Sequence, residues 1–127
     1  MIIGIKYLTT MPYNEKLADR IREALVDLGD VEEKKMFRGV TFMVNGKMCV
    51  TVSGDELMCR IDPDKQDEAL KRKNSRQVIM KDKPMAGWIK VSEEGIKSKK
   101  DFDYWIDLSL GFNKKAKASK KTPSKKK

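Results

Sequence analysis

Residues 40–61 decide the fold, and they read VTFMV-NG-KMCVTV-SGD-ELMCRI. Two runs rich in β-branched and apolar residues flank Asn45-Gly46, a pair that tolerates the positive φ angles of a tight hairpin turn. A third run follows a second turn, which contains Gly54. The pattern predicts a three-stranded antiparallel meander on which the rest of the chain packs.

The turn lengths also predict which residues share a face of this sheet. A two-residue loop pairs Val44 with Lys47, and so Met43 with Met48 and Thr41 with Val50. Side chains alternate between faces, so the face assigned to the helix-covered core carries Thr41, Met43, Met48, Val50, Val52, Leu57, Cys59 and Ile61. The opposite face carries Val40, Phe42, Val44, Lys47, Cys49, Thr51, Met58 and Arg60.

The second face is too apolar for a surface that meets only water. Cover by the chain's own loops or another helix is one explanation. A surface for self-association or for a protein partner is the other. In that case the predicted contact residues are Val40, Phe42, Val44 and Met58.

The positive charge is concentrated at one end of the chain. The net charge is +9, but the segment 114–127 contains no acidic residue and eight lysines: Lys114, Lys115, Lys117, Lys120, Lys121, Lys125, Lys126 and Lys127. Residues 1–113 therefore carry a net charge of only +1. The terminal segment has too little apolar surface to offset its ordering entropy, so we predict a disordered tail.

The composition excludes several kinds of site. The chain contains no histidine, which rules out Ser-His-Asp catalysis and histidine metal ligands. Cys49 and Cys59 are predicted on opposite faces, so they are not expected to form a disulfide. Free thiols fit a reducing cytoplasm. We expect no catalytic residues, no metal and no cofactor, because no glycine-rich phosphate loop or other nucleotide fingerprint is present either.

Outside the meander, the hydrophobic pattern alternates between helix and strand. It predicts a helix between the cap Asn14 and Gly29, a strand over 31–37, a short helix after Asp62-Pro63, strands over 77–80 and 87–91, and a helix over 101–112 capped by Asp101. The order is helix, three to four strands, helix, two strands, helix. This order predicts an α+β fold, an antiparallel sheet with helices mainly on one face.

Three segments resemble one protein family. Residues 11–22 (MPYNEKLADRIR) look like its first helix, residues 33–48 (EKKMFRGVTFMVNGKM) resemble its most distinctive stretch, and residues 83–91 (KPMAGWIKV) resemble its second signature. The family is TfoX (Sxy), and the resemblance is to its N-terminal domain, over about residues 11–112. Arg38 stands where many relatives have glycine.

The resemblance implies an α+β fold like that of type III secretion chaperones. It also implies a link to competence genes, since full-length members act as transcriptional co-regulators in bacteria. Those regulators continue into a helical C-terminal domain, where this chain has its lysine tail. We therefore predict an N-terminal extension (1–10), a TfoX N-terminal-like domain (11–113) and a disordered tail (114–127).

Two functions follow as hypotheses. The first is a cytoplasmic, non-enzymatic module that regulates through a protein partner or as a homodimer, with no role at a membrane. The alternative is non-specific nucleic-acid binding through the lysine tail, because lysines that neutralise phosphates bind without reading sequence.

Overall fold

A computed structural model describes residues 13–36 and 38–116 of the chain. Its centre is a six-stranded antiparallel sheet with strand order β1-β2-β3-β4-β6-β5. The strands are β1 (Val31–Met36), β2 (Gly39–Val44), β3 (Lys47–Ser53), β4 (Glu56–Arg60), β5 (Ser75–Met80) and β6 (Lys83–Val91). The helices are α2 (Glu15–Ala24), η1 (Pro63–Lys65), α3 (Gln66–Ala69), η2 (Glu93–Ile96) and α4 (Lys99–Asn113).

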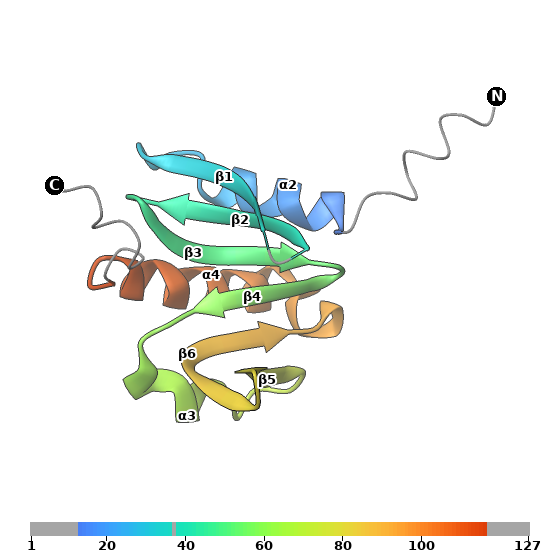
Figure 1. The fold of residues 1–127 in the computed structure, drawn as a ribbon. Helices are drawn as coiled ribbons and strands as arrows, with labels where there is room; N and C mark the ends of the chain where they lie inside the picture. The colour runs from blue at the N-terminus through green and yellow to red at the C-terminus, as the bar shows by residue number, and fades with distance from the viewer. Residues whose placement is uncertain (1–12, 37, 117–127) are drawn as a thin grey trace, which may run out of the picture.

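The two longer helices cover the same face of the sheet. Figure 1 shows α2 behind β1 and β2, and α4 behind β3 and β4, while the face toward the viewer carries no helix. We call these the helix face and the open face. The short helix α3 lies beside the β5–β6 end. The predicted α+β class, with an antiparallel sheet and helices mainly on one face, is confirmed.

Both long helices begin at a side-chain cap. The Asn14 side chain accepts a hydrogen bond from the Leu17 amide (3.1 Å), as predicted. The last helix is capped by Ser98, whose Oγ accepts from the amide of Asp101 (3.1 Å), so the prediction of Asp101 as the cap was wrong. The first helix also ends earlier than predicted, at Ala24, because the chain changes there to tighter three-residue turns before Gly29.

The predicted register of the meander holds at both turns and fails between them. Val44 pairs with Lys47 and Met43 with Met48, as expected, but Phe42 then pairs with Val50. The ladder therefore contains a β-bulge, in which Cys49 is the extra residue of β3. A bulge of one residue reverses the faces beyond it, and the continuous ladder assumed from the sequence could not include it.

Because of the bulge, several residues lie on the face opposite to the one predicted. On the helix face lie Val40, Phe42 and Val44, which belong to the core cluster with Val50, Val52, Leu57, Cys59 and Ile61. On the open face Met43 pairs with Met48 and Thr41 with Thr51, so Thr41, Met43 and Met48 lie opposite to the prediction. The hydroxyl groups of Thr41 and Thr51 are hydrogen-bonded there at 2.7 Å, and both side chains are buried.

A second irregularity shapes the β5–β6 hairpin. The register shifts between Gln77 and Ile79, and Gly87 has a φ of 83°. The Gln66 side chain holds this segment: its Oε1 accepts from the Gly87 amide (2.7 Å) and from the Gln77 side chain (3.0 Å). The Gly87 carbonyl also accepts a hydrogen bond from the Ile61 amide (2.7 Å). The irregular segment is thus fixed by hydrogen bonds to α3 and to the end of β4.

Two predicted segments lie partly or wholly outside the described residues. The extension over 1–10 and the lysines from Lys117 onward fall there. The described chain continues past α4 to Ala116, which is buried and whose amide donates to the Phe112 carbonyl (2.9 Å). Within residues 13–36 and 38–116, no helix is both long and apolar enough to cross a membrane.

Candidate partner interface

The open face carries an apolar cavity of about 170 Å³. Its lining residues come from four strands, and four of the six are methionines: Met48, Met58, Val78, Met80, Met85 and Trp88. The cavity is smaller than the roughly 300–1,000 Å³ of typical small-molecule sites. It therefore suits a single large side chain of a partner better than a cofactor.

The two irregularities of the sheet build this cavity. The bulge at Cys49 places Met48 on the open face, and alternation along β4 places Met58 there too. The irregular segment of β6 brings Met85 and Trp88 to the same face. Met80, which is 39% exposed, closes the side nearest the β5–β6 turn. Methionine side chains adapt their shape, and such surfaces recur where proteins bind varied partners.

Positive side chains stand beside the cavity. In an antiparallel ladder, residues directly opposite each other share a face. Three lining residues have a cation opposite them: Met58 pairs with Lys90, Trp88 with Arg60, and Met80 with Lys83. The Arg60 guanidinium lies 5.5 Å from the centre of the Trp88 ring, within the range of a cation–π contact.

The predicted contact residues divide between the two faces. Met58 lines the cavity. Val40, Phe42 and Val44 are at most 3% exposed and lie in the core beneath the helices, so they offer no surface to a partner. Sequence reasoning missed the other five lining residues. The signal for them was the unusual methionine content, eight in 127 residues, with Met80 and Met85 on either side of one hairpin turn.

The family comparison agrees with the observed fold. The family model of the TfoX N-terminal domain matches residues 23–113, which is more than half of the chain. The chain belongs to the TfoX N-terminal domain family. The matched segment includes all six strands, and so every residue that lines the cavity. The comparisons with curated proteins and with solved structures found no match.

Both cysteines of this TfoX-family domain lie in its core, contrary to the prediction of opposite faces. Cys49 and Cys59 are at most 1% exposed, belong to one core cluster, and are free thiols. Burial away from water disfavours the thiolate and raises the pKa of each thiol to about 12. The nearby Arg60 lowers the pKa of Cys49 by less than burial raises it. Neither thiol is a nucleophile at neutral pH.

The buried thiols predict a loss of stability in alkaline solution. The unfolded chain has the ordinary thiol pKa of 9.0, so above that pH it releases protons that the folded state retains up to about pH 12. The free energy of unfolding then falls as pH rises, by about 1.4 kcal/mol per pH unit for each thiol. Urea unfolding at about pH 8 and about pH 10, with Cys49→Ala as the comparison, measures this slope. A wild-type slope equal to that of the variant would show that Cys49 contributes nothing.

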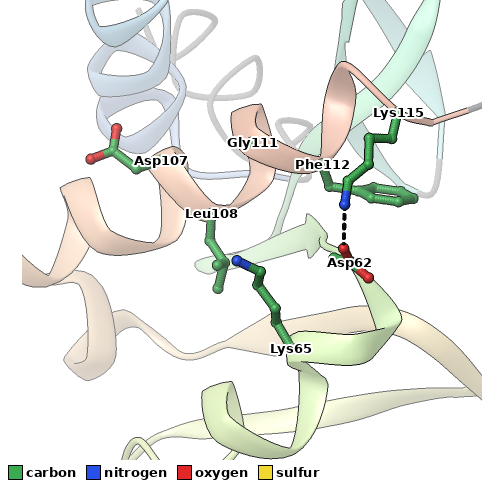
Figure 2. Close-up of a pocket in the computed structure, with 7 residues that line it drawn as sticks. All are labelled: Asp62, Lys65, Asp107, Leu108, Gly111, Phe112 and Lys115. Carbon is green, nitrogen blue, oxygen red and sulfur yellow. Dashed lines mark hydrogen bonds and ion pairs between the residues drawn. The ribbon is translucent and has the colours of Figure 1, made fainter.

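A second cavity, of about 140 Å³, lies between the end of α4 and η1. Figure 2 shows Lys115 reaching from the end of α4 to Asp62, with an Nζ–Oδ2 distance of 2.7 Å. The hydrogen bond from Lys115 lowers the pKa of Asp62, and the Asp64 amide, which donates to the same carboxylate (2.9 Å), adds to the effect. Asp62 thus caps η1 and ties the chain after α4 to the body. The Asp62–Lys115 pair is structural, since the two charges pair with each other.

A groove of about 420 Å³ lies between α2 and α4, and most of its lining side chains are charged. Arg20 donates to the Ile96 carbonyl (2.8 Å) and lies 4.1 Å from the centre of the Phe102 ring. Lys99 and Asp103 form an ion pair at 2.6 Å. In the part of the chain that the structure describes, no three potential metal ligands lie together. The apolar cavity of the open face is therefore the strongest candidate for a binding site.

Proposed function

We propose that this protein is a cytoplasmic, non-enzymatic regulatory module that binds a protein partner on the open face of its sheet. The observation that carries the proposal is the methionine-lined cavity. An apolar cavity on a sheet face without helices is a surface that a partner can fill with one anchoring side chain. The partner is either another protein or a second copy of this chain.

Family membership supports a regulatory role. The chain shares its domain with the N-terminal part of TfoX-type regulators, for which the resemblance implies control of competence genes. In the proposed role the domain contributes a docking surface and no chemistry. Two observations favour this over catalysis: the chain has no histidine, and both of its thiols are buried and protonated at neutral pH.

Replacing Met80 with glutamate is expected to weaken partner binding strongly while the fold survives. Met80 is 39% exposed, so the new carboxylate remains hydrated, but it places a charge at the rim of an apolar cavity. The expected loss is about 30-fold in affinity, which corresponds to about 2 kcal/mol at a hot-spot residue. Affinity purification from the native host, with the full chain as bait, measures retention of the partner. Sedimentation of the same variants measures the homodimer.

The matched control is Ile79→Glu. Ile79 is the neighbouring residue in β5, is 59% exposed, and does not line the cavity. It therefore receives the same charge next to the same turn. Equal retention of the partner by Met80→Glu and wild type, or equal loss of the partner by Met80→Glu and Ile79→Glu, would show that the cavity is not the binding site.

Non-specific nucleic-acid binding through the lysine segment is a second candidate function. It is favoured by the eight lysines without an acidic residue over 114–127. Lys115 is already paired with Asp62, so the remaining lysines would have to supply the binding. If most engage phosphates, affinity falls by about 10³–10⁵-fold between about 50 and about 200 mM salt.

A truncation after Ala116 tests this second function. It keeps the Lys115–Asp62 pair and the buried Ala116, and it removes only the segment from 117 onward. Fluorescence anisotropy with a labelled DNA duplex should show binding by the full chain and none by the truncated chain. Undiminished binding by the truncated chain would refute a role for the tail.

A further inference from the structure

The cavity of the open face differs from a general apolar patch because the charged residues that lie directly opposite its lining residues in the ladder are all cations. We infer that the segment which occupies it is an acidic stretch of the partner protein, in which one large apolar side chain enters the cavity and flanking carboxylates meet Arg60, Lys83 and Lys90. This inference rests on the proposed function, and it adds the chemistry of the partner.

The positions of the three cations follow from the ladder. Each stands directly opposite a lining residue and so shares the open face with it: Arg60 opposite Trp88, Lys83 opposite Met80, and Lys90 opposite Met58. They come from β4 and from both ends of β6, so they border the cavity on different sides. A segment that inserts an apolar anchor places its neighbouring residues within reach of these cations.

The acidic groups nearby do not pair with Lys83 or Lys90. Glu56 is held by Arg76 through two hydrogen bonds (2.8 and 2.9 Å), and Lys90 acts on the same carboxylate only at longer range. Among the described residues, neither Lys83 nor Lys90 forms an ion pair within 4.0 Å. A second acidic residue, Asp82, precedes Lys83 in the turn between β5 and β6. Lys83 and Lys90 therefore give the edge of the cavity positive charge that no ion pair within the described residues neutralises.

Arg60 adds an energetic reason for an anionic partner. Partial burial lowers its pKa, because the surroundings solvate the guanidinium less well than water does. It also lies near two rings, with its Cζ 5.5 Å from the Trp88 centroid and 5.6 Å from that of Phe112. A carboxylate docked beside a partly desolvated cation gains more than one docked at a fully hydrated lysine.

The lining excludes two other occupants. Trp88 is the one lining residue with a polar side-chain atom, so a nucleobase in this cavity would leave most of its hydrogen-bonding edge unpaired. A drug-sized ligand needs more volume than about 170 Å³. A leucine, methionine or phenylalanine side chain meets both requirements.

The test uses the full chain and short fluorescent peptides in anisotropy titrations. One peptide carries leucine and phenylalanine anchors between glutamates. The second has the same anchors with lysine in place of each glutamate, and the third keeps the glutamates but has alanine at the anchors. We expect the first peptide to bind at least about tenfold more tightly than either of the others.

Two double variants locate the charge effect. Lys83→Glu with Lys90→Glu should weaken the acidic peptide by about tenfold or more and strengthen the lysine peptide. The control is Lys16→Glu with Lys100→Glu, which makes the same change of net charge at exposed positions of α2 and α4. It should leave the preference for the acidic peptide in place, and this separates the rim from the charge of the whole chain.

Four outcomes would overturn the inference, and one of them would also overturn the proposed function. Equal binding of the acidic and lysine peptides, both lost in Met80→Glu, would overturn the inference and leave the proposed function standing. Binding that ignores the anchors and Met80→Glu would overturn both. Displacement of the acidic peptide by an oligothymidylate in the chain truncated after Ala116 would show that the rim binds phosphates, and would overturn the inference. No binding by any peptide at millimolar concentration would also overturn it.

Discussion

Phe42→Asp is expected to unfold the protein at room temperature. The Phe42 side chain is fully buried on the helix face, and the centre of its ring lies 6.0 Å from the Cζ atom of Arg22 in α2. Removing a buried phenylalanine side chain alone costs about 3–5 kcal/mol. A carboxylate in its place adds the cost of burying a charge. The sum approaches the whole stability of a typical domain, about 5–15 kcal/mol.

Circular dichroism and urea unfolding measure this effect, with Ile79→Asp as the control. Ile79 is 59% exposed, so the same change of charge should alter stability by less than about 1 kcal/mol. A Phe42→Asp protein that stays folded would place Phe42 on a solvent-facing surface. The register with the Cys49 bulge would then be incorrect, and the continuous ladder predicted from the sequence would be restored.

Gly39→Ala is expected to destabilise the protein by about 3 kcal/mol or more. A Cβ atom at Gly39 would lie 1.8 Å from the carbonyl oxygen of Val52 and 2.9 Å from its carbon. Both are backbone atoms of the neighbouring strand, so the ladder between β2 and β3 must separate to accept one methyl group. Overpacking against side chains costs about 1–3 kcal/mol, and a rigid backbone neighbour places this site at or above that range.

Gly111→Ala is expected to stabilise the protein. Apart from its own helix turn, no atom lies within 4 Å of a Cβ at Gly111, and the residue is in the last turn of α4. Alanine there should raise the free energy of unfolding by about 0.5–1 kcal/mol, because glycine is the weaker helix former. Thermal or urea unfolding of both variants gives the comparison. Equal stability of Gly39→Ala and wild type would contradict the close approach of β2 and β3.

Most of the architecture could be predicted from the sequence, since turns and helix caps are local signals. Asn45-Gly46 fixed one hairpin, and Gly54 marked the next. The cap at Asn14 was also predictable. The bulge at Cys49 was not, because no residue there demands it: a bulge depends on how the strand packs against α4, which is tertiary information.

That single residue accounts for part of the failure to predict the candidate site. A continuous ladder places Phe42 on the open face and Met48 in the core, whereas the bulge exchanges them. The remainder of the site depends on β6, where Gly87 and the hydrogen bonds of Gln66 bring Trp88 next to Met58. These contacts join segments that are far apart in the sequence, so they could not be predicted from a local pattern.

The central claim is that a protein partner docks in the methionine-lined cavity, and site-specific photo-crosslinking in the native host measures this most directly. A photoreactive phenylalanine analogue is introduced at Met80, which lines the cavity, or at the neighbouring Ile79, which does not. The account predicts one dominant crosslinked product from position 80 and none from position 79, and a product of twice 14.6 kDa would identify a second copy of the chain as the partner. Equal crosslinking from both positions, or crosslinking from position 79 alone, would contradict the account.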